Sequence, residues 1–141
     1  MADISSYLEE AILNHVFRNS TGGNNYTSTK IFAGLVTSSA SSEDLEDGTL
    51  TNEVSAYTGN RPEITFTVPT QSSGGKAIIK NVAQIDYEDM PSATVRFAVL
   101  CDSSTIGAGN ILWHLKLSSD KVMNSGDICR IREEELQIDL D

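Results

Sequence analysis

The segment Lys30–Thr37, KIFAGLVT, is almost continuously apolar over the length of a single β-strand. Short apolar runs of this kind, bounded by turn-forming residues and rich in β-branched and aromatic side chains, are typical of buried strands. The segment therefore predicts a central strand of a sheet, around which the rest of the chain is interpreted.

The sequence after this strand alternates short strand-like segments with turn-rich segments. Glu63–Pro69, EITFTVP, places Ile64, Phe66 and Val68 on one side, as in a half-buried strand. The other predicted strands are Ala77–Val82, Thr94–Leu100, Ile111–Leu117, Gly126–Arg132 and Glu135–Asp141. About seven or eight short strands without intervening helical patterns predict a mainly β fold, an antiparallel β-sandwich or barrel.

One amphipathic α-helix is predicted near the N-terminus, over about residues 5–19. Ser6 and Glu9 have the spacing of a capping box, which satisfies free amide groups at the start of a helix. Apolar side chains then recur at helical spacing and form an arc wider than a minimal stripe. The residues of this face are Leu8, Ala11, Ile12, Leu13, His15, Val16 and Phe17. So wide an apolar arc must be covered, either by the β-rich domain or by a neighbouring subunit.

The segment from Thr37 to Arg61 is the least regular part of the chain, rich in Ser, Asp, Glu and Gly with scattered apolar residues. A loop this long in a compact domain is usually functional or mobile. The helix and this loop, at about residues 37–61, are therefore the expected contact elements. The partner-binding residues predicted on them are Leu8, Ile12, Leu13, His15, Val16, Phe17, Leu45, Leu50 and Tyr57.

Length and charge limit the classes of function. The chain of 141 residues carries ten basic and twenty acidic residues, a formal net charge of −10. The length predicts a single domain, residues 1–141, large enough to bury a core. So acidic a chain repels phosphate groups, and we expect no nucleic acid and no membrane as a partner. With no membrane-spanning stretch and no signal-peptide pattern, synthesis and assembly are expected in a cytoplasm.

Residues capable of nucleophilic or metal chemistry are few. Cys101 and Cys129 lie in apolar strand-like runs and are expected to be buried, reduced thiols, although spacing leaves a disulfide open. Two cysteines and two separated histidines give no zinc-site spacing. Neither His15, on the apolar helix face, nor His114, expected to alternate outward from a strand, has a nucleophile motif around it.

Two acidic clusters are candidate sites for a metal ion or for catalysis. EDLEDG, at Glu43–Gly48, lacks the spacing of an EF-hand, although a calcium ion in this loop stays open. Asp86, Glu88 and Asp89, just before Met90, are typical of a solvated turn, and glycoside hydrolysis by Asp86 or Glu88 is a minor alternative. The sequence therefore predicts no enzyme, with no catalytic residue, no cofactor and no metal site.

A set of short motifs covers most of the chain. They are the opening Asp3–Asn19, the Tyr26-Thr27 step, Lys30–Thr37, Tyr57, the strand Thr65–Val68, Trp113–Leu115 and the turn Asn124–Asp127. Together they resemble a family of small virion proteins of tailed bacteriophages. Members of that family are described as capsid decoration (cement) proteins or as tail-fibre-like proteins.

The resemblance implies a non-enzymatic, β-rich module that binds the outer surface of the assembled capsid lattice. A protein that binds only the assembled lattice stabilises it by mass action, and many copies multiply the effect. The implied partners are the major capsid protein and further copies of the chain, in a small homo-oligomer on the outer capsid surface. The alternative is a tail or tail-fibre component, with host-glycan binding through exposed aromatic residues as one role open to it.

Overall fold

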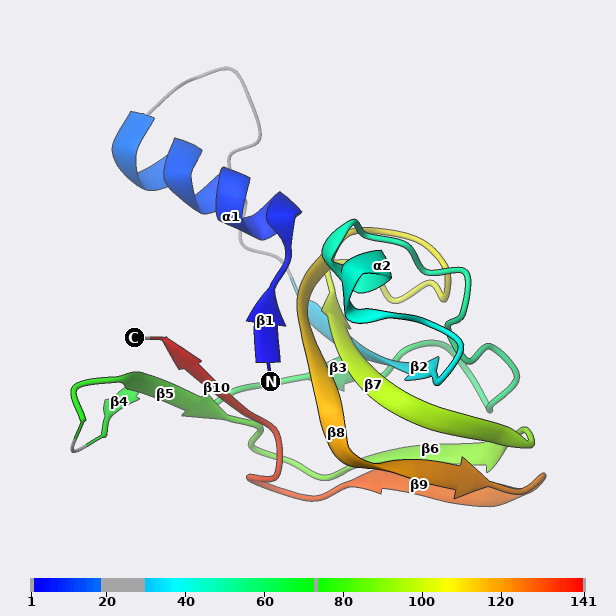
Figure 1. The fold of residues 1–141 in the computed structure, drawn as a ribbon. Helices are drawn as coiled ribbons and strands as arrows, with labels where there is room; N and C mark the ends of the chain where they lie inside the picture. Colours follow the sequence, from blue (N-terminus) through cyan, green and yellow to red (C-terminus); the bar gives the residue numbers. More distant parts are fainter. Residues whose placement is uncertain (1, 19–29, 73, 141) are drawn as a thin grey trace.

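The computed structural model describes residues 2–18, 30–72 and 74–140 (Figure 1). Its strands are β1 (Ala2–Ile4), β2 (Ile31–Thr37), β3 (Glu63–Ile64), β4 (Thr70–Gln71), β5 (Ala77–Lys80), β6 (Ile85–Met90), β7 (Ala93–Cys101), β8 (Ile111–Met123), β9 (Asp127–Ile131) and β10 (Gln137–Leu140). Its helices are α1 (Ser6–Leu13), continued by the π-helical turn η1 (Asn14–Arg18), and α2 (Ser42–Glu46).

The strands of the described residues form three sheets, in which all pairings are antiparallel. The largest has the order β1-β8-β7-β2-β3, a second has the order β10-β5-β4, and β6 pairs with β9. Figure 1 shows β6 and β9 below the large sheet and the β10-β5-β4 sheet extending to one side. The mainly β, sandwich-like fold is confirmed, and the sheets do not close into a barrel.

The main core lies between the large sheet and the layer that contains β6 and β9. Its buried side chains include Leu35 and Leu100 from the large sheet, and Tyr87 and Met90 from β6. Burial of these apolar side chains is the dominant force that holds the two layers together. Leu136, just before β10, closes the core at the side of the third sheet.

The opposite face of the large sheet is also covered. Val36, Phe97 and Val99 on this face pack with Leu45 of α2 and with Ile111. Strand β2 is therefore buried on both faces, which explains the nearly continuous apolar sequence of KIFAGLVT. The prediction of a central strand is confirmed, since β2 lies between β7 and β3.

Strand β6 lies where the sequence predicted a solvated turn. Ile85 and Tyr87 are buried at alternate positions, but Asp89 has a φ of 53° and the register with β9 shifts between Tyr87 and Met90. This bulge places Met90, rather than Asp89, in the core. The bulge breaks the alternation of apolar and polar residues by one position, which hid the strand.

The prediction of one continuous strand over Glu63–Pro69 is wrong. Only β3 pairs with β2, and the next residues turn to the neighbouring sheet. The amide of Thr67 donates to the carbonyl oxygen of Lys80 at 2.8 Å, and Phe66 bridges to Asn81. The alternating sequence therefore belongs to an extended segment that crosses between sheets. The other predicted strands correspond to β2, β5, β7, β8, β9 and β10.

Candidate interaction surfaces

The N-cap of helix α1 lies one residue before the predicted cap, Ser6. Ser5 is the N-cap, and its Oγ accepts a hydrogen bond from the amide of Leu8 at 3.4 Å. The predicted capping box of Ser6 and Glu9 is wrong, because the hydroxyl of Ser6 donates instead to Glu46 Oε1 of α2 at 3.3 Å. The predicted end of the helix at Asn19 lies outside the described residues, as does the Tyr26-Thr27 step.

The start of the helix is attached to the first residues of β8. Strand β1 pairs with β8 so that Ile4 lies opposite Trp113. The amide of Ser5 then donates to the carbonyl oxygen of Leu112 at 3.1 Å, and its hydroxyl donates to the carbonyl oxygen of Ile111. These bonds continue the sheet up to the helix and fix the direction in which the helix leaves the body.

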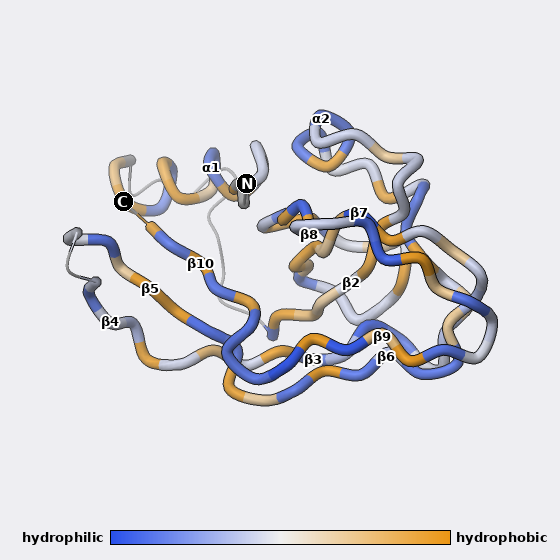
Figure 2. The backbone as a smooth tube through the Cα atoms, turned by 60° about the horizontal axis from the view of Figure 1, so that its bottom comes forward, coloured by the Kyte–Doolittle hydropathy of each residue, from blue (hydrophilic) through white to orange (hydrophobic). Residues whose placement is uncertain are grey.

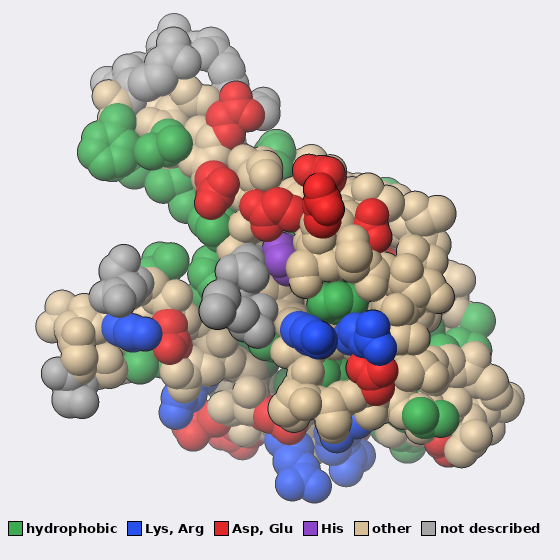
Figure 3. All heavy atoms as spheres, in the orientation of Figure 1, with side chains coloured by type: hydrophobic (Ala, Val, Ile, Leu, Met, Phe, Trp, Pro, Cys, Tyr) green, Lys and Arg blue, Asp and Glu red, His purple; other side chains and the backbone are tan. Residues whose placement is uncertain are grey.

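The two faces of α1 and η1 differ in exposure. Ala11 and Asn14 are buried, and Leu8 is half-buried, while His15 is exposed. Large exposed apolar side chains occupy the other face: Ile12 (36 %), Leu13 (57 %), Val16 (62 %) and Phe17 (77 %). We call these four residues the apolar helix face. Figures 2 and 3 show α1 projecting from the body with apolar residues toward its outer end.

The sequence left two coverings open for this face, the β-rich domain of the same chain and a neighbouring subunit. The described part of the body does not cover the apolar helix face, although it holds the helix at its start. Soluble proteins rarely leave neighbouring large apolar side chains in water unless the patch serves as a contact site. The apolar helix face is therefore the first candidate interaction surface, and its role in binding a partner stays a prediction.

In the long segment from Thr37 to Arg61, in contrast to the helix, the large apolar side chains are buried or half-buried. Leu45 of α2 is fully buried against the large sheet, the half-buried Leu50 packs against the cluster that contains Leu45, and Tyr57 is buried in the main core. The rings of Tyr57 and Tyr87 meet edge to face at 5.1 Å between centroids. Burial raises the pKa of Tyr57 to about 12. Leu45 and Tyr57 are buried and Leu50 is half-buried, so these side chains contribute mainly to the cores, and their role in binding a partner stays a prediction.

A buried ion pair holds the same segment in place. Arg61 donates to Glu53 through Nε at 2.6 Å and through Nη2 at 2.7 Å, and both side chains are almost fully buried. Arg61 Nη1 also donates to the carbonyl oxygens of Ser103 and Ala108, each at 2.8 Å. Glu53 Oε2 accepts a bond from the amide of Gly107 at 2.8 Å. The pair thus connects the long segment to the β7–β8 loop.

Gly34 in β2 makes room for this pair. A Cβ atom at this position would lie 2.6 Å from Glu53 Oε1 and 3.1 Å from a methyl group of Val99. Only glycine lets the carboxylate approach the sheet so closely. No local pattern in the sequence links Glu53 and Arg61 to Gly34 or to the β7–β8 loop, so the pair was not predicted.

His114 and the acidic loop at Glu43–Gly48 make contacts that stabilise the fold. His114 is buried, not outward-facing as predicted, with Nε2 2.9 Å from Glu46 Oε2 of α2. The acidic loop around Asp44 is helix α2 with a capping box, and the hydrogen bonds from Ser41 hold the pKa of Asp44 below its usual range. Among the described residues, no group of three or more His, Cys, Asp or Glu side chains is placed to hold a metal ion.

Asp86, the minor candidate for a catalytic acid, lies in an ion pair at the surface. Arg130 Nε donates to Asp86 Oδ1 at 2.7 Å, and this bond holds the pKa of the carboxyl group below its usual range. Cys101 and Cys129 are free thiols, and burial raises the pKa of Cys101 to about 12. The absence of enzymatic activity stays a prediction.

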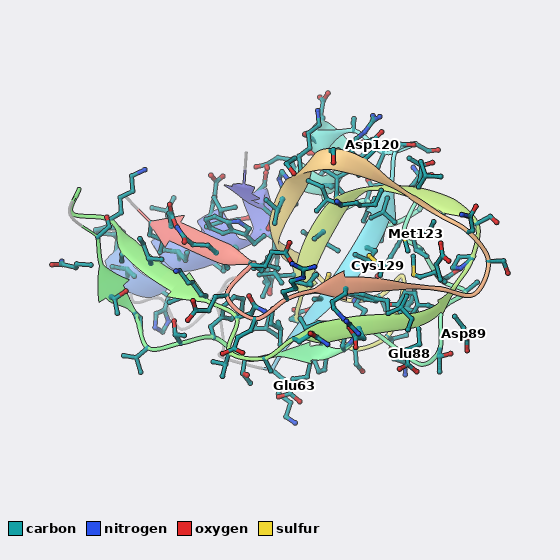
Figure 4. All side chains as sticks on the ribbon, turned by 90° about the horizontal axis from the view of Figure 1, so that it is seen from below. Glu63, Glu88, Asp89, Asp120, Met123 and Cys129 are labelled. Carbon is teal, nitrogen blue, oxygen red and sulfur yellow. The ribbon has the colours of Figure 1, made fainter. Side chains whose placement is uncertain are left out.

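A groove between β8 and β9 is the second candidate interaction surface. It has a volume of about 340 Å³ and opens beside the second half of β8. Its half-buried apolar side chains include Leu117, Met123 and Ile131, and the exposed Ile128 lies at its edge. In Figure 4, Met123 and Cys129 lie between β8 and β9, whereas Glu88 and Asp89 point away from the body. We call this feature the β8–β9 groove.

Charged side chains flank the β8–β9 groove. Lys121, Arg130 and Glu135 contribute to its lining, and all three are exposed. Lys116 lies directly opposite Phe97 in the sheet, so its side chain projects on the α2 face and not into the groove. Arg130 is paired with Asp86, but Lys121 forms no ion pair with any described residue. The groove was not predicted, because the polar second half of β8 had no strand pattern.

No helix in the described parts of the chain is long and apolar enough to cross a membrane. Residues 3–139 match the protein family described as "Podophage GP4 fiber I protein gp80". The match therefore includes α1, the long segment and nearly all of the β-structure. No curated protein matches the chain.

Proposed function

Because this chain belongs to the family of the podophage GP4 fiber I protein gp80, and so is a structural protein of a tailed-phage particle, we propose that it is a fibre subunit. The observation that carries the proposal is the apolar helix face, which projects from a body whose other large apolar side chains mostly lie in two cores. The subunit would join its neighbours in the particle through this helix.

The attachment of the helix suits such a role. Because β1 and Ser5 are hydrogen-bonded to β8, the helix has a defined direction before any partner binds. A contact element that is already ordered loses less conformational entropy on binding than a disordered one. An amphipathic helix laid into an apolar groove is also a recurrent mode of recognition between proteins. The proposal needs no catalytic residue and no cofactor.

Capsid decoration would use the same apolar helix face with a different partner. In that case the face would contact the major capsid protein on the outer surface of the shell. The fibre proposal is preferred because the matching family is described as a fibre protein. The two functions differ in where the protein lies on the particle and in how many copies the particle carries.

The test is the copy number and position of the protein in purified particles. Quantitative mass spectrometry against the major capsid protein gives the copy number, and antibody labelling in electron microscopy gives the position. The proposal predicts few copies relative to the major capsid protein, with label at the tail. Label over the whole shell, at a stoichiometry near that of the capsid protein, would move the function to decoration. Absence from the particle would contradict both.

A further inference from the structure

We propose that the apolar helix face of one copy binds in the β8–β9 groove of a second copy. This inference rests on the proposed function, which gives the helix a docking role, and adds the occupant and the site. Both surfaces are present in every copy of the chain, and each lacks a partner among the described residues of its own copy.

The two surfaces match in chemistry. Leu13 and Phe17 are four residues apart on the helix, so they lie one above the other and form a ridge. The groove offers apolar side chains on both sides, from β8 and from β9. Insertion of the ridge would remove apolar area of both copies from water, which is the main favourable term in protein association.

The two surfaces also match in charge. Glu9 and Glu10 are exposed one helical turn before the apolar helix face, and Glu9 lies three and four residues before Ile12 and Leu13. The groove carries Lys121, which has no ion-pair partner in the described part of its own chain. Its other charged lining residues are Arg130, which is paired with Asp86, and Glu135. Two copies with a net charge of −10 repel each other over most of their surfaces. A contact between the acidic start of the helix and Lys121 of the groove offsets that repulsion and fixes the orientation.

The helix cannot enter the groove of its own copy while β1 stays in the sheet. Strand β1 runs antiparallel to β8, from Leu115 toward Trp113, so the chain moves away from the second half of β8 as it reaches the helix. The groove lies along Leu115–Met123, in the opposite direction. Figure 1 accordingly shows α1 and the β8–β9 end of the body on opposite sides of the molecule. The occupant of the groove is therefore the helix of another copy.

The proposed contact joins two different surfaces, so it is heterologous. Each copy has one helix to give and one groove to fill, and repetition of the contact builds a closed ring or an open array. Such an assembly suits a subunit that is repeated within a particle.

The test uses the purified full chain and two complementary variants. The helix variant Leu13→Asp/Phe17→Asp keeps its groove, and the groove variant Met123→Asp/Ile128→Asp keeps its helix. Mass is measured by light scattering after size-exclusion chromatography, and circular dichroism checks folding. Val68→Asp is the matched control, because Val68 is an equally apolar, 81 % exposed residue outside both surfaces. Because Met123 is half-buried, Lys121→Glu serves as a second groove variant that changes only an exposed side chain.

We expect the wild type and Val68→Asp to form oligomers, and each helix or groove variant alone to be monomeric. The dissociation constant should rise at least about 100-fold, because a carboxylate placed in an apolar contact is left unpaired. Mixing the helix variant with a groove variant should restore a single contact and give a one-to-one dimer. Glu9→Lys/Glu10→Lys should weaken assembly, and combination with Lys121→Glu in the same chain should restore it.

Two results would overturn the inference. A wild-type chain that stays monomeric at concentrations well above 100 µM would exclude it, as would folded groove variants that assemble like the wild type. The second result would mean that the helices pack on one another or on another surface. Failure of the proposed function is seen separately: a protein that assembles as described but is absent from the phage particle would contradict the fibre role and not the contact.

Discussion

The N-terminal helix and the segment from Thr37 to Arg61 carry similar apolar side chains but use them in opposite ways. Leu45 of the segment is fully buried, whereas Leu13 of the helix is 57 % exposed. The sequence predicted both as contact elements, and in the structure the buried apolar side chains of the segment, Leu45, Val54 and Tyr57, lie in the cores. An irregular, acidic segment can thus be an essential part of a sandwich when its few apolar residues meet an uncovered sheet face. A regular amphipathic helix can remain uncovered when its attachment directs it away from the body.

The largest expected effect tests whether the segment is truly part of the fold. Replacement Arg61→Met leaves Glu53 buried without its partner, and removal of one member of a buried pair costs about 3–5 kcal/mol. Urea unfolding of the purified protein measures the loss. The control is Lys30→Met, because Lys30 and Glu63 form a surface pair that contributes at most about 1 kcal/mol. Equal effects of the two replacements would contradict the assignment of the Arg61 pair to the core.

The next effect compares the two regions with one substitution. Leu45→Ala should lower the free energy of unfolding by about 2–5 kcal/mol, because it removes a fully buried side chain. Leu13→Ala should change that free energy by at most about 0.5 kcal/mol, because the side chain is mostly in water. Thermal and urea unfolding of both variants check the contrast under conditions where the protein is monomeric. A large loss for Leu13→Ala would show that the helix packs on its own body.

Alkaline pH should weaken the part of the fold that contains the segment. Burial raises the pKa of Tyr57 and of Cys101 to about 12, from ordinary values of 10.0 and 9.0. The folded state therefore keeps protons that the unfolded state releases, so these groups contribute fully below about pH 9 and their contribution falls as the pH rises toward 12. We expect the free energy of unfolding to fall by roughly 3 kcal/mol between pH 9 and pH 11.

Tyr57→Phe separates the contribution of one group. The hydroxyl of Tyr57 is buried and has no hydrogen-bond partner in the described residues, so its removal should cost little at pH 7. The variant should lose about 1 kcal/mol less than the wild type between pH 10 and pH 11. Unfolding curves at closely spaced pH values check this, and an unchanged pH dependence would contradict a buried, neutral Tyr57.

The smallest effect concerns the attachment of the helix. Ser5→Ala removes the N-cap and should destabilise α1 by about 1 kcal/mol, whereas Ser6→Ala should change it by a few tenths at most. Hydrogen exchange of the α1 amides, measured by mass spectrometry, reports the local stability. Faster exchange in Ser6→Ala than in Ser5→Ala would contradict the assignment of the cap.

The parts of the fold that were predicted from sequence are those governed by local periodicity. Strand β2 is apolar throughout because both of its faces are covered. The residues of α1 show the helical spacing of apolar side chains, and they precede the first glycine of the chain. The missed features depend on contacts between distant residues or on local exceptions. The bulge at Asp89 hid β6, and the crossing near Phe66 made an extended connection look like a strand.

The candidate site also has parts that the local sequence predicts and parts that depend on distant contacts. The helical spacing of Leu13 and Phe17 was visible in the sequence, but only the structure shows that the body leaves them uncovered. The Glu53–Arg61 pair and the β8–β9 groove were invisible, because each brings together segments far apart in the chain.

The measurement that tests the account most directly is the amount of Leu13→Asp/Phe17→Asp protein in phage particles. A phage that lacks the wild-type copy is complemented with this variant, and the copy number in purified particles is compared with wild type and Val68→Asp by mass spectrometry. We expect the variant to fold with a wild-type unfolding curve and Val68→Asp to enter particles normally. The copy number of the variant should fall below about a tenth of the wild-type number. Incorporation at the wild-type level would show that the apolar helix face is not the contact that places this protein in the particle.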